Sequence, residues 1–205
     1  MSSIGLIVLA AGASARLGRP KQLLPIAGCS LLRHAARTAL SSICRPVVVV
    51  LGAQARLLEK ELHDLPVAAI RNPLWETGIG SSICAGLRTL PASELLAVIF
   101  MVCDQPMVSP ELLNRLAAVH QNAAKGIVAS EYSGTMGVPA LFGRKYFAEL
   151  AALPPGGGAK SLMVKHQDDL QAVPFPEGAL DVDTTEDALR LQNDQGLPNR
   201  CSITI

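Results

Sequence analysis

The sequence is poor in aromatic side chains, which make up 3% of its 205 residues, although hydrophobic residues make up 49%. The core must therefore be built from Leu, Val, Ile and Ala. Few aromatics also argue against a protein that stacks on single-stranded nucleic acid. The net charge of +1 provides no concentrated basic face for a phosphate backbone, so we expect no nucleic acid partner.

Cysteine pairs with the spacing of a zinc site are missing. The five cysteines contain no CxxC, and an odd number of scattered thiols is typical of a reduced environment. The first residues, MSS, lack the basic segment of a signal peptide. The apolar runs are shorter than the ~20 residues that a membrane helix needs. We therefore expect a cytoplasmic protein with no membrane partner.

Several motifs with fixed spacing are absent as well. The sequence has no HExxH and no GxSxG, which argues against a zinc hydrolase and the simplest serine hydrolase. The spacing of Gly12 and Gly18 does not fit GxxxxGK[ST], and GxGxxG does not fit either. A Walker A loop and a dinucleotide fingerprint are therefore excluded.

Apolar runs of strand length are present, at 4–10, 46–52, 66–71 and 95–103. Their continuity predicts strands buried on both faces, as in a parallel sheet. Helical patterns separate them: one capped by Ser30, one over 53–63, one over 81–90 and one that begins at Pro110. Over 53–63, we expect Leu57, Leu58 and Leu62 to share one buried face.

This alternation predicts an α/β fold, with a Rossmann-like, doubly wound, mostly parallel sheet flanked by helices. In the second half, the runs 126–131 and 138–142 flank a Ser-Gly turn and predict a short antiparallel excursion. Further helices are expected over 143–153, 161–166 and 184–195, with a short strand over 172–175. We expect a single domain over 1–205, in which the tail 197–205 has no assignment.

The first apolar run ends in a loop of small residues, 11–15, and three cations follow closely: Arg16, Arg19 and Lys21. Backbone N–H groups of such a loop can approach a phosphate chain, and the cations can neutralise it. We interpret this segment as the binding site for the triphosphate of a nucleotide. The alternative is a tight strand-to-helix turn that is basic without a ligand.

Asp104 follows the 95–103 run, at the edge of the sheet where α/β proteins bind ligands. Pro106 ends the strand and leaves the carboxylate exposed. Such an oxygen ligand suits Mg²⁺, which commonly takes one or two carboxylates plus substrate phosphates. The alternative role for a single Asp is a helix cap or a turn residue.

A second acidic segment, DVDT, begins at Asp181 and places two carboxylates on one side of an extended chain. Its alternative role is helix capping, either by Asp183 with Glu186 or by Thr184 with Asp187. A cap on Thr184 leaves Asp181 and Asp183 for a metal, whereas a cap on Asp183 leaves Asp181.

The segment NPLWETGIGSS begins at Asn72, which can offer a donor and an acceptor to a base edge. Gly80 allows close backbone approach, and the hydroxyls of Ser81 and Ser82 are expected at the start of a helix. Trp75 is the only tryptophan, and we expect a buried core anchor rather than a base-stacking residue.

Taken together, these motifs resemble those of the MobA-like nucleotidyltransferases, and most of all the branch of molybdenum cofactor cytidylyltransferases. The matching segments occur in the family's order, at 9–25, 72–87, 103–113, 137–142, 156–160 and 181–188. The resemblance implies a Rossmann-like fold. It also implies transfer of a nucleoside monophosphate from an NTP to a phosphate on molybdopterin, with release of pyrophosphate, and a molybdoenzyme that receives the product.

The resemblance also assigns roles to residues. Triphosphate contacts map onto Leu9, Ala10, Ala11, Gly12, Arg16 and Lys21. Base and ribose contacts map onto Asn72, Gly80, Ser81 and Ser82. Metal ligands map onto Asp104, Asp181 and Asp183. We expect Mg²⁺ at Asp104 to bridge the reacting phosphates, and Arg16 and Lys21 to carry the charge of the leaving pyrophosphate. An acceptor phosphate is already ionised, so no catalytic His is needed.

Ala11 bears on the choice of nucleotide. CTP-using members resemble LAAG at the first loop and GTP-using members resemble LAGG, so Ala11 points to CTP. One methyl group gives only ~1–3 kcal/mol of discrimination. The GGGAK segment at 156–160 replaces a GDRGAR-like stretch common in the branch, which leaves the acceptor in doubt. The alternatives are GTP as donor, a sugar phosphate or other phosphorylated acceptor, and a non-catalytic cofactor-binding chaperone.

Overall fold

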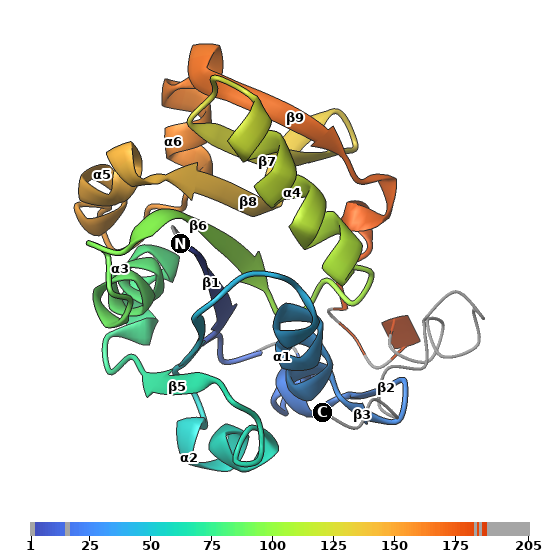
Figure 1. Cartoon of the computed structure of the whole chain (residues 1–205). Coiled ribbons are helices and arrows are strands. Elements are labelled where there is room, and N and C mark those ends of the chain that lie inside the picture. Colours follow the sequence, from blue (N-terminus) through green and yellow to red (C-terminus); the bar gives the residue numbers. More distant parts are fainter. Residues whose placement is uncertain (1–2, 15–16, 183, 185, 188–205) are drawn as a thin grey trace.

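The structure is a computed structural model that describes residues 3–14, 17–182, 184 and 186–187 (Figure 1). The strands of the main sheet are β1 (Ser3–Ala10), β4 (Val47–Leu51), β5 (Ala68–Arg71), β6 (Leu95–Val102), β7 (Ile127–Tyr132), β8 (Thr135–Gly143) and β9 (Leu170–Pro174). Their order across the sheet is β5-β4-β1-β6-β8-β7-β9. A separate hairpin pairs β2 (Pro25–Ile26) with β3 (Cys29–Ser30).

Six α-helices lie within the described ranges: α1 (Leu31–Ser41), α2 (Ala55–Leu58), α3 (Ile79–Thr89), α4 (Pro110–Asn122), α5 (Phe147–Ala151) and α6 (Lys160–Lys165). The 3-10 turns are η2 (Lys21–Leu23), η3 (Glu59–Glu61), η4 (Trp75–Thr77), η5 (Arg144–Tyr146), η6 (Gln167–Asp169) and η7 (Pro176–Ala179). Among the helices of these ranges, none has the length and apolar character to cross a bilayer.

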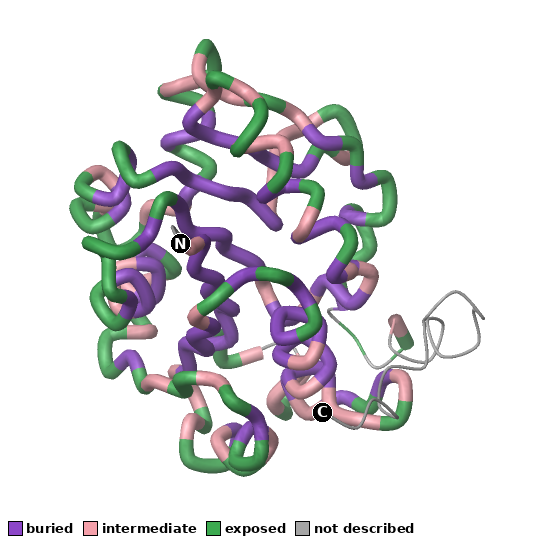
Figure 2. The backbone as a smooth tube through the Cα atoms, viewed as in Figure 1, coloured by how far each residue is buried: buried purple, intermediate pink, exposed green. Residues whose placement is uncertain are grey.

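The helices form a layer on each face of the sheet (Figure 1). The core side chains of α1 and α4 belong to one cluster, and those of α3, α5 and α6 belong to the other. Along β1, Leu6 and Val8 face the first cluster, whereas Ile7 and Leu9 face the second. Because side chains alternate along a strand, the continuous apolar run is buried on both sides, as Figure 2 shows for the centre of the sheet.

The first half of the sheet is parallel and follows the predicted Rossmann-like topology. From β1 the chain adds β4 and then β5 on one side, and it then crosses to place β6 on the other side of β1. In such sheets ligands bind beyond the carboxyl ends of the strands, at the point where the chain changes direction. This topology therefore places a candidate site between the ends of β1 and β6.

The second half contains the predicted antiparallel excursion. β8 runs antiparallel to both β6 and β7, and β9 runs parallel to β7. The turn between β7 and β8 has positive φ angles at Ser133 (48°) and Gly134 (70°). Two such residues are typical of a tight hairpin turn whose twist matches that of the flanking strands.

Two predictions about elements are wrong. Over 53–63 the chain forms the short α2 followed by the 3-10 turn η3, and Leu57 is 42% exposed while Leu58 and Leu62 are buried. Leu58 and Leu62 take the buried side of this segment, and Leu57, about 100° around the helix from Leu58, faces solvent. β5 was expected to be buried on both faces, but Ala68 and Ala69 are exposed because β5 is the edge strand. Most of the predicted helix 184–195 lies outside the described residues.

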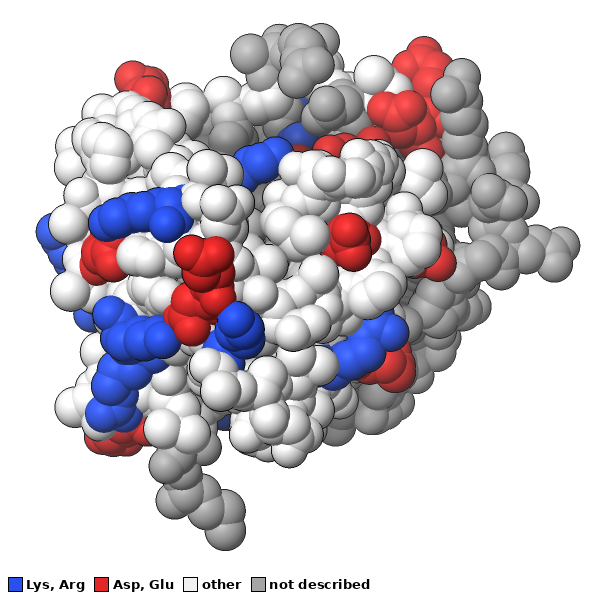
Figure 3. Space-filling model, turned by 90° about the horizontal axis from the view of Figure 1, so that it is seen from above, with Lys and Arg blue, Asp and Glu red and all other residues white. Residues whose placement is uncertain are grey.

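Charged side chains are mixed rather than separated by sign. On the face shown in Figure 3, lysines and arginines lie beside aspartates and glutamates, with wide uncharged areas between them. Ion pairs within the described residues include Lys165 with Glu149 at 2.6 Å and Lys145 with Asp169 at 2.7 Å.

Candidate functional site

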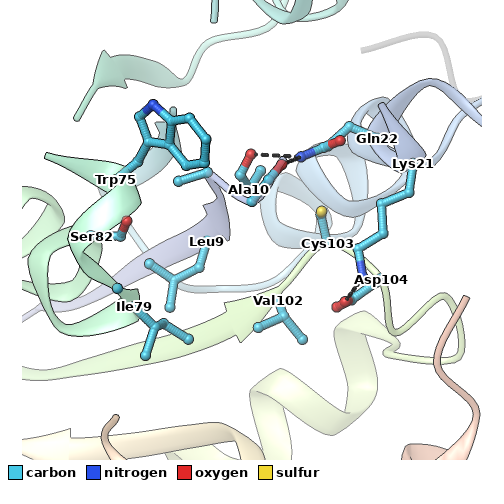
Figure 4. A pocket seen from close by; sticks show the side chains of 13 residues that line it. Leu9, Ala10, Lys21, Gln22, Trp75, Ile79, Ser82, Val102, Cys103 and Asp104 are labelled. Atoms are coloured by element: carbon cyan, nitrogen blue, oxygen red, sulfur yellow. Dashed lines mark hydrogen bonds and ion pairs between the residues drawn. The ribbon is translucent and has the colours of Figure 1, made fainter. Parts of the chain in front are cut away.

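A pocket of about 240 Å³ lies beyond the carboxyl ends of β1 and β6 (Figure 4). Its lining comes from the end of β1 and the loop after it, from η2, from η4 and the first turn of α3, and from the end of β6 with the residues that follow it. The lining residues are Leu9, Ala10, Ala11, Gly12, Lys21, Gln22, Trp75, Gly78, Ile79, Ser82, Val102, Cys103 and Asp104. The pocket therefore lies where the topology predicts a ligand site, and it includes seven of the residues expected to bind nucleotide or metal.

Lys21 and Asp104 form an ion pair in this pocket, with 2.5 Å between Nζ and Oδ2. The two residues are 83 positions apart in the sequence, and their side chains are 18% and 21% exposed. The basic segment after β1 and the acid after β6 therefore meet at one place. The cation expected at the triphosphate and the acid expected at the metal are therefore neighbours, and their roles stay predictions.

Gln22 shapes the loop that follows β1. Its Nε2 donates hydrogen bonds to the carbonyl oxygens of Ala10 at 3.0 Å and Gly12 at 2.8 Å, as Figure 4 shows. Its Oε1 accepts a hydrogen bond from Ser14 Oγ at 3.3 Å, and Ser14 Oγ accepts one from the backbone N–H of Lys21 at 2.9 Å. The loop and η2 are thus held together by a continuous set of hydrogen bonds.

The second acidic segment lies next to Asp104. The backbone N–H of Val182 donates to the carbonyl oxygen of Asp104 at 2.9 Å, and the Val182 side chain is fully buried in a small cluster with Leu24 and Ile26. Asp181 therefore precedes a residue that is fixed beside Asp104. Burial raises the pKa of Tyr132, and the nearby charges of Asp181 and Asp104 raise that pKa further.

The capping alternatives for this segment are also resolved. Thr184 N–H donates to Asp187 Oδ2 at 2.9 Å, and Asp187 N–H donates to Thr184 Oγ1 at 3.1 Å. This reciprocal pair is the capping box of Thr184 with Asp187, the second of the two predicted alternatives. Asp183 and Arg16 lie outside the described residues, and their expected roles stay predictions.

The residues present suit a hard divalent cation. Asp104 Oδ1 is buried and has no hydrogen-bond partner among the described atoms, so it retains an acceptor for a ligand. The described residues contain no group of three His, Cys, Asp or Glu side chains that could hold a metal ion without help. One or two carboxylates completed by substrate phosphates are the usual ligand set for Mg²⁺.

Asn72 is buried next to the pocket and holds the start of α3 in place. It is 3% exposed; its Oδ1 accepts from the Leu74 N–H at 3.0 Å, and its Nδ2 donates to Ser81 Oγ at 2.8 Å and Ser82 Oγ at 3.0 Å. The amide thereby fixes the first turn of α3, from which Ser82 lines the pocket. Direct contacts of Asn72 and Ser81 with a base or ribose stay predictions.

Gly80 allows a close approach, as expected, but the group that approaches it is protein backbone. Its N–H donates to the carbonyl oxygen of Pro155 at 2.8 Å, and a Cβ at Gly80 would lie 2.2 Å from the carbonyl oxygen of Pro154. Gly80 therefore packs α3 against the 154–158 loop. A contact between Gly80 and nucleotide stays a prediction.

Trp75 is not the buried core residue that we expected. It is half-buried on the pocket wall, and a Cβ at Gly52 would lie 2.6 Å from Trp75 Cβ. Trp75 follows the edge strand β5, so its ring lies at the pocket wall rather than in the core. The sequence analysis also missed Gln22, Ile79 and Val102, whose residue types carry no signal for ligand binding.

Cys103 is a small buried residue in the wall of the pocket. Burial raises the pKa of its thiol well above the usual range, and the neighbouring Asp104 charge adds to the rise. The side chain is therefore a neutral thiol in the pocket wall.

A second pocket, of about 280 Å³, shares Leu9, Ile79 and Val102 with the first. The rest of its lining comes mainly from β8, the end of β7 and the start of α6, and most of it is apolar. Lys160, in the GGGAK segment, donates from Nζ to Thr135 Oγ1 at 3.0 Å at this pocket. The shared wall means that ligands in the two pockets would lie next to each other.

Comparisons with known proteins agree with this architecture. A family model described as MobA-like NTP transferase domain matches residues 6–170. Purine catabolism protein PucB of Bacillus subtilis is 30% identical over 191 residues, which cover 88% of this chain and 92% of that protein. Nicotine blue oxidoreductase of Paenarthrobacter nicotinovorans is 39% identical over 116 residues. That match covers 56% of each protein, so the chain spans about half the length of this relative.

Solved structures resemble almost the whole chain. Rv0371c from Mycobacterium tuberculosis H37Rv aligns with a TM-score of 0.80 and 29% identity, over 94% of this chain and 98% of that chain. A complex of Rv0371c with manganese aligns with a TM-score of 0.78 and 27% identity, over 94% of this chain and 100% of that chain.

Proposed function

We propose that this chain, which belongs to the MobA-like NTP transferase family, transfers CMP from CTP to the phosphate of molybdopterin and releases pyrophosphate. The observation that carries the proposal is the contact of 2.5 Å between Lys21 Nζ and Asp104 Oδ2 at the carboxyl ends of β1 and β6. A cation for a leaving pyrophosphate and a carboxylate for a metal ion lie side by side there.

On the donor side, the loop after β1 and Lys21 would bind the triphosphate. Ala11 and Gly12 line the pocket with backbone and very small side chains, which leaves room for phosphates to approach the chain. Lys21 would stabilise the charge that grows on the leaving pyrophosphate, and Arg16 would assist.

Asp104, with Asp181 or Asp183, would hold the divalent ion. Mg²⁺ bound there supplies charge neutralisation and polarises the phosphate that is attacked. The orphaned Oδ1 of Asp104 is the acceptor that supports this assignment. The manganese complex of Rv0371c supports a divalent metal for a protein of this fold.

On the acceptor side, the second pocket would take the pterin. Its apolar lining suits the faces of a flat ring system, and Lys160 supplies a cation at the wall. Within the described residues, no histidine lines either pocket. An acceptor phosphate is already ionised near neutral pH, so its attack needs orientation and charge neutralisation rather than a general base.

The experiment that tests this function is a pyrophosphate-release assay with each of the four NTPs, with and without molybdopterin. We expect release with CTP only when molybdopterin is present, together with a cytosine dinucleotide product. Pyrophosphate release with a sugar phosphate in place of molybdopterin would mean that the sugar phosphate is the acceptor. Binding of molybdopterin without any release would favour a cofactor-binding chaperone.

Ala11→Gly tests the choice of nucleotide. Ala11 lines the pocket, and its carbonyl oxygen is fixed by the N–H of Ala53 at 3.1 Å, so the lost methyl group should widen the base site locally. We expect the preference for CTP over GTP to fall by a factor on the order of 10, the effect of one methyl group in a tight pocket. A competition assay with both nucleotides measures the ratio.

The matched control is Ala13→Gly, because Ala13 is exposed in the same loop and does not line the pocket. It adds the same backbone freedom without widening the site. An unchanged base preference in Ala11→Gly would assign nucleotide selection to another segment.

A further inference from the structure

Gln22 is a buried polar side chain to which the proposed function assigns no part. It is 1% exposed, and its hydrogen bonds run to Ala10, Gly12 and Ser14. Burial of an amide is costly unless its polar atoms are satisfied, and here both ends of the amide are satisfied by one loop. A side chain of this kind fixes the conformation of the loop that it contacts.

The hydrogen bonds of Gln22 set the direction of peptide groups. Its Nε2 holds the carbonyl oxygens of Ala10 and Gly12 at 3.0 and 2.8 Å. In a trans peptide the C=O and the next N–H point in opposite directions. The N–H groups of Ala11 and Ala13 are therefore turned away from Gln22. These are N–H groups of the loop that would approach the phosphates.

The same network includes the main chain of Lys21. Ser14 Oγ donates to Gln22 Oε1 at 3.3 Å and accepts from the Lys21 N–H at 2.9 Å. The Lys21 side chain then reaches Asp104 on the other side of the pocket. The buried amide of Gln22 thus connects the loop after β1, through Ser14 and Lys21, to Asp104.

We infer that Gln22 is a positioning residue that holds the loop after β1 and Lys21 in the one arrangement that fits a triphosphate. The inference rests on the proposed function, because it presumes an NTP in the pocket. Its effect is specific: it concerns the β- and γ-phosphates more than the base, which contacts other parts of the site.

The test compares the binding of CTP and CMP to the wild type and to Gln22→Met. Methionine keeps the length and the packing of the side chain but forms none of the three hydrogen bonds. Calorimetric titration in the presence of Mg²⁺ gives both dissociation constants, and Trp75 on the pocket wall gives a fluorescence signal for the same titrations. We expect the dissociation constant of CTP to rise roughly tenfold, the effect of one or two lost hydrogen bonds, and that of CMP to change much less.

Ser42→Ala is the control for loss of a buried polar group. Ser42 is 6% exposed and donates to the Ala39 carbonyl oxygen at 2.7 Å. It precedes β4, so it lies near the amino ends of the strands, whereas the pocket lies at their carboxyl ends. The Ser42→Ala variant should be less stable than the wild type, but the ratio of its dissociation constants for CTP and CMP should not change. Ser14→Ala removes the hydrogen bonds of Ser14 to Gln22 Oε1 and to the Lys21 N–H but leaves both bonds from Gln22 Nε2 to the loop. It should weaken CTP binding relative to CMP binding in the same direction by a smaller factor.

Two results would overturn the inference: equal weakening of CTP and CMP in Gln22→Met, which is the sign of a general loss of structure, or no weakening of either. If Gln22→Met does not fold, Ser14→Ala decides by the same ratio. Failure of the proposed function would be recognised by a different result: the wild type itself would bind none of the four NTPs. The inference would then fail as well.

Discussion

Lys21 and Asp104 contact each other directly, and this contact has consequences for binding. The Lys21 ammonium pairs with Oδ2 of Asp104 at 2.5 Å, so it neutralises the carboxylate whose other oxygen, Oδ1, we propose as the metal ligand. If Asp104 binds the metal ion as proposed, Lys21 and the metal would compete for the charge of one carboxylate. A triphosphate would attract Lys21 and release Asp104, so we expect nucleotide and metal to bind cooperatively.

Lys21→Met tests this competition. Without nucleotide, the variant should bind Mn²⁺ more tightly than the wild type, by a factor of several, because the competing ammonium is gone. Its turnover should fall roughly 100-fold, the effect of one lost preorganised charge contact. Electron paramagnetic resonance of free Mn²⁺ measures the first effect, and pyrophosphate release measures the second.

Lys165→Met is the matched control, since Lys165 is an exposed cation paired with Glu149 at 2.6 Å and lines neither pocket. Weaker Mn²⁺ binding in Lys21→Met would mean that Lys21 supports the metal site instead of competing for it.

Residue types alone pointed to Lys21 and Asp104, which the fold places side by side. A cation after a small-residue loop and an acid at the end of a buried strand carry their chemistry in their identity, and the strand pattern was enough to bring Lys21 and Asp104 together. Gln22 was missed because its role depends on two backbone carbonyls that no residue type reveals. Trp75 was misjudged because its burial depends on which strand lies at the edge of the sheet.

Elements with continuous apolar sequence were the most predictable. β1, β4 and β6 are buried on both faces as expected, because each has a strand on both sides and a helix layer above and below. The apolar run of β5 looks similar, but an edge position leaves it exposed, and strand order cannot be read from one strand. The apolar pattern of α2 likewise did not show that the helix would tighten into η3 after one turn.

The contact between η5 and η6 gives a prediction for stability. Burial opposes ionisation of Asp169, but hydrogen bonds from Lys145 at 2.7 Å and from Tyr146 outweigh it and lower the pKa of Asp169 to about 2. A lowered pKa means that the folded state favours the carboxylate. The stabilisation is therefore present above the unfolded pKa of 3.8 and is lost as the pH falls toward 2.

Asp169→Asn should accordingly lower the free energy of unfolding at pH 7, by on the order of 1 kcal/mol because the site is partly exposed to solvent. The difference from the wild type should shrink as the pH falls from 4 toward 2. Urea unfolding at several pH values measures it. A difference that stays constant with pH would mean that packing, rather than the charge of Asp169, is the source of the stability.

At the scale of the molecule, the first pocket joins segments that are distant in the sequence, from Leu9 to Asp104. A ligand that binds all of them should stabilise the fold as a whole. With CTP and Mg²⁺ at 100 times the dissociation constant, we expect about 2.7 kcal/mol of added stability. For a chain of this size that corresponds to a rise in Tm of about 5–10 °C.

Differential scanning calorimetry measures this shift, and Asp104→Asn provides the comparison. Asparagine keeps the size of the side chain but removes its charge, so the shift with CTP and Mg²⁺ should become small. Asp64→Asn, at an ion pair with Arg33 away from the pocket, should keep the full shift. A full shift in Asp104→Asn would show that the metal is held elsewhere.

The two pockets share only the wall formed by Leu9, Ile79 and Val102. Most of the remaining lining of the second pocket belongs to β7, β8, α6 and the turn before α6, and Ile83 of α3 and Phe100 of β6 complete it. Substitutions in those segments can therefore alter the shape and polarity of one chamber while the neighbouring chamber keeps its own walls. If the two pockets hold donor and acceptor as proposed, such a division would let natural variation, and protein engineers, change the acceptor while the donor site stays the same.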